Sequence, residues 1–362
     1  MSGSKKNVEK YFGLLLGAMT GDSLGLPFEM LSPVQIKRIY GRDIRHNFLP
    51  IPFIGRFGIC SDDTEHLWIT ALSLCKTPKK NIDIFGRELS SHLKRWLLTC
   101  PIGIGKATLL SCLKMLVGTD YNKSGIYSAG NGAAIRAVII GAFHSNDLES
   151  MFYTLRVSTL MTHTDPRTYE GSLVIALAAM IAMNSKPERT PTSFFFSSLP
   201  SFINGEELLL FLNLAESHLS QNSSLTDYLN DLPGLKKGIS GYVNHTVPAV
   251  IYAWLRYYGN YRETICQIIA AGGDTDSTAA LAGALSGITV GSEGIPKDWL
   301  KGAWGWPLTV NNWHQVSQAL ADPESVQVAK PVNLLFLFRN LVSFPIFGFH
   351  IVRRIIDAIC HQ

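Results

Sequence analysis

The sequence SDDT at Ser61–Thr64 and the sequence GGDTDS at Gly272–Ser277 are two short acidic blocks, and each opens an apolar stretch with helical spacing. Each block joins two carboxylates to hydroxyl groups, and the blocks lie about 210 residues apart. Carboxylate and hydroxyl oxygens are hard ligands that suit Mg²⁺, Mn²⁺ or Ca²⁺. Four carboxylates in a small volume are costly unless cations neutralise them. We therefore predict that the fold joins the two blocks in a two-metal carboxylate site.

Helix capping is the alternative explanation of these blocks, because Asp and Ser side chains accept hydrogen bonds from the free N–H groups of a first helical turn. Asp62 and Glu65 have the spacing of a capping box, and Asp276 could cap the helix that follows it. One cap per helix suffices, so capping leaves the second carboxylate of each block unexplained. The two explanations are compatible, since one carboxylate can cap while its neighbour faces a cavity.

The composition indicates a folded chain with a large core. Of the 362 residues, 46% are hydrophobic and 17% are charged, and the net charge is only +4. No long run of Lys and Arg marks a nucleic-acid-binding surface, so we expect no nucleic-acid partner. The six cysteines include no CxxC pair, and the polar start lacks a secretory pattern. We therefore expect reduced thiols and a cytoplasmic location.

Helical spacing dominates the chain, and few segments alternate with period two. Helices rich in small residues, such as the one containing Ala279–Ala284, would allow their neighbours to approach closely. We find neither βαβ units nor a repeat period, so we predict one compact, all-α, multi-helix domain. The predicted helices are Val8–Leu24, Thr64–Leu74, Ile84–Leu98, Lys106–Leu116, Asn131–Phe143, Leu148–Leu160, Tyr169–Met183, Glu206–Glu216, Val247–Tyr258, Glu263–Ala270 and Ser277–Leu285.

Two segments differ in composition from the rest. Ser193–Asn230 is rich in Ser, Phe and Asn, and we interpret it as a surface insertion with one or two helices. The tail, Val332–Gln362, is apolar but interrupted by Arg339, Asn340, Pro345 and His350, which makes it a poor transmembrane helix. We expect the tail to pack on the domain or on a partner, and a weak interfacial membrane contact is the alternative.

Two further segments lie between the acidic blocks. The first, Ser128–Arg136, is a glycine-rich loop before a predicted helix, an arrangement that can cradle phosphate through backbone N–H groups. A tight turn before a helix, with a structural Arg136, explains the same residues. The second, Met161–Pro166, contains His163, which is either a contact for a substrate hydroxyl or a structural histidine.

In this order, these segments resemble the ADP-ribosylglycohydrolase family, in its dinitrogenase-reductase-activating and ADP-ribosylarginine hydrolase branch. Ser61 and Ser277 stand where many members have Thr, and both keep a hydroxyl group. The resemblance covers a catalytic domain at 9–325 and leaves 326–362 as an apolar C-terminal extension. The matching segments are the first helix with its acidic residue (Gly17–Glu29), the first acidic block (Ser61–Thr64), the glycine-rich loop (Gly130–Arg136), the histidine segment (Met161–Tyr169), the second acidic block (Gly272–Ala280) and the closing segment (Ile295–Trp299).

The resemblance implies an all-α domain with a binuclear Mg²⁺ or Mn²⁺ centre that hydrolyses the bond between the distal ribose and a modified group. Glu29 is then a gating ligand or general acid/base, with Asp63 as the alternative base. His163 would contact the distal ribose. The implied metal ligands are Ser61, Asp62, Asp63, Asp274, Asp276 and Ser277. The implied catalytic residues are Glu29, Asp62, Asp63 and Asp276, and the implied pyrophosphate-binding residues are Ser128, Gly130, Asn131 and Gly132.

The linkage that is cleaved is expected to be to arginine. The block SDDT with His66 soon after it, and the Met-Thr-His start of the histidine segment, look most like the arginine-directed branch. The implied partner is an ADP-ribosylated protein. One alternative is an inactive protein that binds ADP-ribose or an ADP-ribosyltransferase. Another is a hydrolase of a different linkage, to serine or in a small metabolite.

Overall fold

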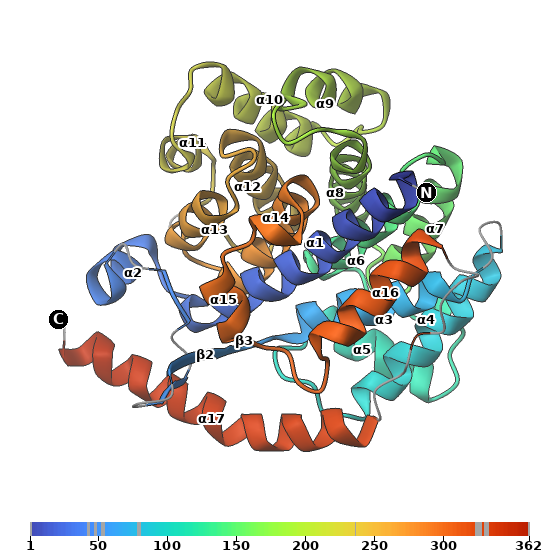
Figure 1. Cartoon of the computed structure of the whole chain (residues 1–362), viewed down its shortest axis with the longest axis horizontal. Coiled ribbons are helices and arrows are strands. Elements are labelled where there is room, and N and C mark those ends of the chain that lie inside the picture. Colours follow the sequence, from blue (N-terminus) through green and yellow to red (C-terminus); the bar gives the residue numbers. More distant parts are fainter. Residues whose placement is uncertain are drawn as a thin grey trace.

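The computed structural model describes residues 2–41, 44–46, 49–51, 55–77, 81–235, 237–322, 328 and 333–360. Helices dominate this part of the chain, which confirms the predicted all-α class (Figure 1). The α-helices run, in chain order, α1 (Ser2–Gly25), α2 (Pro33–Tyr40), α3 (Asp62–Cys75), α4 (Ile82–Leu97), α5 (Lys106–Leu116), α6 (Gly132–Phe143), α7 (Leu148–Leu160), α8 (Pro166–Asn184), α9 (Thr192–Ser198), α10 (Glu206–Ser220), α11 (Leu225–Asp231), α12 (Val243–Arg256), α13 (Tyr261–Ala270), α14 (Thr275–Val290), α15 (Lys297–Gly302), α16 (Val310–Ala321) and α17 (Asn333–Cys360).

A small sheet and short 3₁₀ helices connect these helices. The sheet has the order β1 (Leu49–Ile51), β2 (Gly55–Ile59) and β3 (Ala303–Trp304). β1 pairs with β2 in the antiparallel sense, and β2 pairs with β3 in the parallel sense. The 3₁₀ helices are η1 (Leu26–Phe28), η2 (Tyr121–Lys123), η3 (Leu199–Ser201) and η4 (Ser292–Gly294). β2 ends two residues before Ser61, so the sheet leads the chain directly into the first acidic block.

The centre of the molecule is a close pair of helices, α1 and α14 (Figure 1). α1 carries a glycine at every fourth position from Gly13 to Gly25, and helical residues four apart share one face. A Cβ at Gly17 would lie 2.3 Å from the carbonyl oxygen of Gly283 on α14, and one at Gly21 would lie 2.1 Å from that of Ala279. Small residues therefore allow the contact that we predicted for the Ala279–Ala284 segment, and this contact joins the N-terminal and C-terminal parts of the site.

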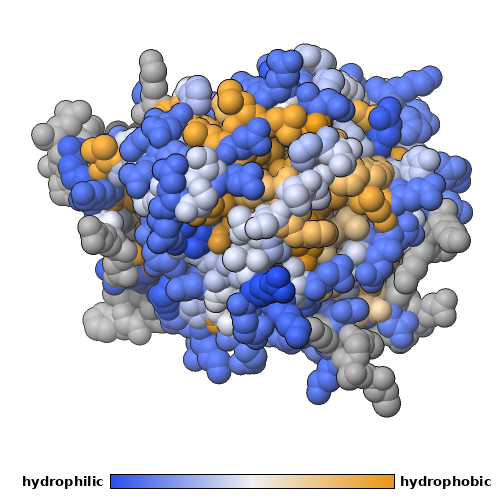
Figure 2. Space-filling model, turned by 90° about the horizontal axis from the view of Figure 1, so that it is seen from above, coloured by the Kyte–Doolittle hydropathy of each residue, from blue (hydrophilic) through white to orange (hydrophobic). Residues whose placement is uncertain are grey.

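The main hydrophobic core extends into the segment that we interpreted as a surface insertion. Three helices, α9 to α11, form there, and Phe195, Leu212 and Tyr228 are fully buried in the core. That interpretation was therefore wrong, because the apolar side chains of this polar-looking segment fall on the inner faces of its short helices. Figure 2 views the molecule from the side on which α9 and α10 lie in Figure 1, and it shows hydrophobic residues near the middle of this face with hydrophilic residues around them.

The C-terminal tail forms one long helix, α17, that runs along the edge of the molecule (Figure 1). It packs on the domain, as expected, through Phe336, Asn340 and Ser343, which are buried. Many of its large apolar side chains remain exposed, among them Leu334, Phe338, Leu341, Phe344 and Phe349. In the described part of the chain, no helix is both long and apolar enough to cross a membrane. The expected domain boundary at residue 325 lies outside the described residues.

Candidate functional site

One cavity of about 550 Å³ gathers nearly all of the residues that the sequence singled out. It is lined by Glu29, Asp62, Asp63, Ser128, Gly130, Asn131, Gly132, His163, Asp274, Asp276 and Ser277. Of the predicted site residues, Ser61 does not line the cavity, although it is buried directly behind it. The fold therefore brings together two acidic blocks, a glycine-rich loop and a histidine that are far apart in the sequence.

The first acidic block is held by a buried carboxylate on α1. Asp22 is completely buried and accepts hydrogen bonds from the Ser61 N–H at 3.0 Å, the Thr64 N–H at 3.2 Å and the Thr64 hydroxyl. Ser61 is the N-cap of α3, and its hydroxyl accepts the N–H of Asp63 at 3.2 Å. Capping thus uses Ser61, and the predicted capping box of Asp62 and Glu65 does not form.

The second acidic block is held by backbone contacts of two glycines. Gly272 and Gly273 both have positive φ, at 68° and 87°, and a Cβ at Gly273 would lie 2.0 Å from the Ile239 carbonyl oxygen. Gly273 donates to the Leu31 carbonyl at 2.8 Å and accepts from the Met30 N–H at 2.7 Å. These bonds place the turn at Glu29 beside Asp274, and only glycine allows the chain to pass there. Asp274 is the N-cap of α14, so Asp276 is not the cap.

Like charges and burial shape the electrostatics of the cavity. Burial raises the pKa of Asp62 to about 8, and the nearby Asp22 adds to this shift. Burial raises the pKa of Asp63 well above its ordinary value, and the acidic groups around it, among them Asp274, raise it further. The pKa of Asp276 is raised in the same way, by burial and then by Glu29 and other carboxylates. The two blocks are therefore close enough to repel each other, a condition that bound cations would relieve.

The donor set fits hard divalent cations. The cavity offers carboxylate oxygens from both blocks and the hydroxyl of Ser277, and Oδ1 of Asp276 is buried without a hydrogen-bond partner among the described residues. Hard oxygen ligands of this kind suit Mg²⁺ and Mn²⁺. As they stand, however, no three His, Cys, Asp or Glu side chains in the described part of the chain form a group that could hold a metal ion. The binuclear centre therefore stays a prediction.

The glycine-rich loop lines the same cavity and is tied to the second block. Asn131 is the N-cap residue of α6, and its side-chain amide donates to Asp274 at 2.7 Å and to Thr246 at 3.0 Å. Ser128 accepts the N–H of Gly130 at 3.3 Å, and α6 begins at Gly132. Asn131, predicted to contact substrate, thus also fixes the position of a carboxylate in the second block.

His163 is a buried, neutral imidazole that reaches the cavity. Burial, together with the nearby Arg136, lowers its pKa to about 3. Its Nδ1 lies 2.9 Å from the Thr162 hydroxyl, whose oxygen accepts a hydrogen bond from Arg136 at 2.6 Å. In the tautomer in which the Thr162 hydroxyl donates to Nδ1, Nε2 of His163 carries the N–H and lies near Gly130. Arg136 is fully buried and structural, one of the two roles considered for it.

Sequence reasoning missed several residues of this site. Asp22 was seen only as part of the first helix, although a carboxylate inside a glycine-rich apolar face is a signal that could have singled it out. Lys106 and Lys237 are exposed cations that line the cavity, and the backbone of Gly238–Gly241 forms part of its wall. Cys60 is a poor nucleophile, because burial strongly raises the pKa of its thiol.

A second and larger cavity, of about 1070 Å³, lies near α7, α8 and α9. Its lining includes Leu177, Met180 and Phe194, and none of the predicted site residues belongs to it. Size alone therefore does not identify the candidate site, whereas the gathered carboxylates and the glycine-rich loop do.

Comparisons with known proteins agree with this geometry. The model of a family described as ADP-ribosylglycohydrolase matches residues 4–326. ADP-ribosylhydrolase ARH3 of Homo sapiens is 24% identical over 359 residues, covering 87% of this chain and 96% of the relative. ADP-ribosyl-[dinitrogen reductase] glycohydrolase of Rhodospirillum rubrum is 25% identical over 300 residues, covering 81% and 89%. A solved structure, titled ADP-ribosylglycohydrolase-related protein complex, shares the fold with a TM-score of 0.65 at 21% identity, covering 88% of this chain and 98% of that one.

Proposed function

The chain belongs to the ADP-ribosylglycohydrolase family, and from that premise we propose that it is a metal-dependent hydrolase that removes ADP-ribose from arginine side chains of modified proteins. The bond broken is the N-glycosidic bond at the distal ribose, and water supplies the hydroxyl group of the released sugar. The observation that carries this proposal is the meeting of both acidic blocks, the glycine-rich loop and His163 at one cavity of about 550 Å³.

The two acidic blocks would hold the cations. Asp62, Asp63, Asp274, Asp276 and Ser277 present oxygen atoms to the cavity, and two Mg²⁺ or Mn²⁺ ions bound there would supply Lewis acidity toward sugar hydroxyls and water. Ser61 would be a further ligand, as the family resemblance implies, and its hydroxyl also serves as the N-cap of α3.

The remaining residues would bind the substrate and handle protons. The N-terminus of α6 at Gly132 and the cations Lys106 and Lys237 suit the negative charge of a pyrophosphate. His163, neutral near pH 7, would donate from Nε2 to a ribose hydroxyl. Glu29 follows η1 at the edge of the cavity and is our candidate for the residue that moves a proton or gates the site.

Arginine is the proposed linkage on the strength of two sequence features. One is the SDDT block with His66 soon after it, and the other is the Met-Thr-His start of the histidine segment. The structure adds that His66 lies 3.8 Å from Asp62 and that burial keeps its pKa well below the ordinary value. His66 therefore faces the first block as a neutral group.

The experiment compares two substrates under identical conditions. Peptides carrying ADP-ribose on arginine or on serine are incubated with the full chain and Mg²⁺, and released ADP-ribose is quantified. We expect faster release from arginine and loss of release in EDTA. Faster release from serine would contradict the arginine assignment and leave the family activity intact. No release from either peptide would contradict the proposed function.

A further inference from the structure

The C-terminal helix α17 lies outside the segment that the family model matches, which ends at residue 326, yet it reaches the back of the first acidic block. Arg339 on α17 donates from Nη2 to Oε1 of Glu65 on α3, a partner 274 positions earlier in the chain. The two side chains are only 11% and 3% exposed. This is a buried ion pair between an extension and the helix that carries Asp62 and Asp63.

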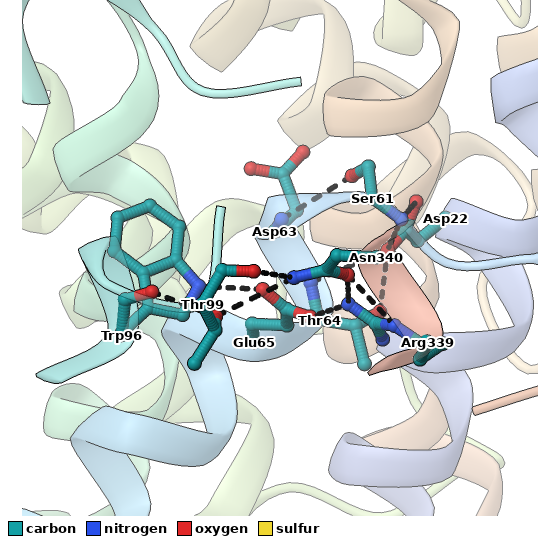
Figure 3. Close-up of polar contacts among 9 residues, drawn as sticks. All are labelled: Asp22, Ser61, Asp63, Thr64, Glu65, Trp96, Thr99, Arg339 and Asn340. Atoms are coloured by element: carbon teal, nitrogen blue, oxygen red, sulfur yellow. Dashed lines mark hydrogen bonds and ion pairs between the residues drawn. The ribbon is translucent and has the colours of Figure 1, made fainter. Parts of the chain in front are cut away.

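The pair belongs to a larger buried network (Figure 3). Trp96, at the end of α4, donates its indole N–H to the other carboxylate oxygen of Glu65. Arg339 also donates to Oδ1 of Asn340 at 2.6 Å, and the amide of Asn340 donates to the Thr99 carbonyl at 2.8 Å. Each oxygen of Glu65 therefore has a donor, and α17 binds both α3 and the chain that follows α4.

Glu65 lies in the same helical turn as the acidic block. In Figure 3 its carboxylate points toward Arg339 and Trp96, whereas the carboxylate of Asp63 points away from them. Asp22 fixes the start of this turn by accepting hydrogen bonds from Ser61 and Thr64. Because a helical turn moves as a unit, a fixed Glu65 also limits how α3 can rotate about its axis and where its first carboxylates point.

α17 also braces the segments that lead into the site. Its residues Ile346 and Phe347 pack on Leu26 of η1, three residues before Glu29, and on Ile59 of β2, two residues before Ser61. Arg339 is also close enough to Asp22 for the two charges to interact. The helix therefore contacts the turn that carries Glu29, the strand that leads to the first block and the first turn of α3.

We propose that α17 is a positioning element of the active site and that Arg339, acting through Glu65, holds the first turn of α3 so that Asp62 and Asp63 face the cavity. The inference rests on the proposed function in that the positioned carboxylates are its metal ligands. A buried carboxylate without its cation partner is costly, so the loss of Arg339 would drive the Glu65 side chain to turn toward solvent. That rearrangement releases the first turn of α3.

The test measures Mn²⁺ binding by electron paramagnetic resonance of the full chain, with melting temperature and kcat as parallel readouts. Arg339→Met is expected to weaken Mn²⁺ binding at least tenfold and to lower kcat. Arg339→Lys keeps the charge but not the planar fork, so it should lie between the wild type and Arg339→Met.

Two controls separate positioning from stability and from surface charge. Leu212→Ala empties a fully buried position on α10 that does not line the site, and it should lower the melting temperature without weakening Mn²⁺ binding. Arg262→Met breaks an exposed ion pair with Asp298. It should leave the Mn²⁺ affinity and kcat within twofold of the wild type and the melting temperature unchanged. If Leu212→Ala weakens Mn²⁺ binding as much as Arg339→Met does, the effect is general instability and the proposal fails.

The double variant Glu65→Gln with Arg339→Met keeps the test decisive if the single variant does not fold. It removes both buried charges, so we expect it to fold and still to bind Mn²⁺ at least tenfold more weakly than the wild type. If Arg339→Met or the double variant folds and binds Mn²⁺ with wild-type affinity, the proposal is overturned. It is also overturned if neither variant shows the cooperative unfolding transition of a folded protein. A wild type that binds Mn²⁺ but releases no ADP-ribose would contradict the proposed function alone. A wild type that binds no Mn²⁺ would overturn the positioning role as well.

Discussion

The two acidic blocks face the same cavity but are held in place by different means. The first is positioned by side chains: Asp22 accepts hydrogen bonds from Ser61 and Thr64. The turn of the second is positioned by backbone groups of Gly272 and Gly273, which hydrogen-bond to Ile239 and to the turn after η1, and Asn131 adds one side-chain contact, to Asp274. A site held by side chains can be adjusted by substitution, whereas one held by glycine backbone tolerates no added side chain. Substitutions on the two sides should therefore fail in different ways.

Removing one ligand from either block tests what the blocks share, and here we expect the largest effect. Asp62→Ala and Asp276→Ala should each lower kcat at least about 1000-fold, or about 4 kcal/mol of transition-state stabilisation, because each removes a hard ligand. The fold should survive, since both carboxylates belong to a cluster of like charges whose repulsion these changes reduce. Asp298→Ala, an exposed position, is the matched control. Full activity of either block variant in EDTA would contradict the metal mechanism.

Adding a methyl group to the second block tests its dependence on backbone. In Gly273→Ala the new Cβ would lie 2.0 Å from the Ile239 carbonyl oxygen, at a φ of 87°. The strained backbone alone costs about 1–3 kcal/mol, and the clash adds to it. We expect a lower melting temperature and about a 100-fold loss of kcat, worth about 2.7 kcal/mol.

Gly41→Ala is the control for that change. Gly41 has a φ of 68°, but a Cβ there would meet no heavy atom within 4 Å. It isolates the backbone strain from the clash and should leave kcat unchanged. Equal effects of the two substitutions on kcat would show that contact with Ile239 does not position the second block.

Replacing the carboxylate behind the first block tests its dependence on side chains. Asp22→Asn keeps the shape but puts an amide N–H₂ where the Ser61 and Thr64 N–H groups seek an acceptor. Losing hydrogen bonds to a charged group costs about 2–3 kcal/mol. We expect a lower melting temperature and about tenfold weaker Mn²⁺ binding, measured by calorimetry. An unchanged Mn²⁺ affinity would mean that the first block keeps its position without Asp22.

The pH dependence of stability reports on the buried His163 in the lining of the cavity. The pKa of His163 in the folded chain is lowered to about 3, so the unfolded chain takes up this proton first as the pH falls. The contribution of neutral His163 to the free energy of unfolding is complete above the pKa of the unfolded chain, about 6.5. This contribution is lost as the pH falls from there toward 3, with about 2 kcal/mol lost between pH 7 and pH 5. His163→Asn should flatten this part of a curve of unfolding free energy against pH. An equally steep curve for the variant would contradict a neutral, buried His163.

The sequence predicted most of the longer helices from local patterns, and it predicted the meeting of the blocks from their shared ligand chemistry and from the family resemblance. α5 and α7 begin and end at the predicted residues, and the cavity contains each predicted site residue except Ser61. What it could not predict depends on contacts distant in the chain. Nothing near Arg339 indicates that its partner is Glu65, and the sequence of α17 does not show which of its apolar side chains stay exposed.

Short helices were also missed, since about two helical turns carry too few residues to show a period. α9 and α11 each span seven residues, and α2 spans eight. The sequence also did not predict the roles of the individual site residues, because a pattern of ligands does not show which carboxylate transfers the proton. Glu29 and Asp63 both line the cavity, so position alone does not separate them.

The most direct test of the central claim, that two differently held blocks form one metal centre, is the number of Mn²⁺ ions bound per chain at saturation. Isothermal titration calorimetry on the wild type, Asp62→Ala and Asp276→Ala provides this number together with the affinities. We predict two ions for the wild type and, for each variant, fewer ions or at least tenfold weaker binding, because ligands from both blocks serve the same pair of ions. Unchanged binding in both variants, or a wild type that binds no Mn²⁺, would contradict the account.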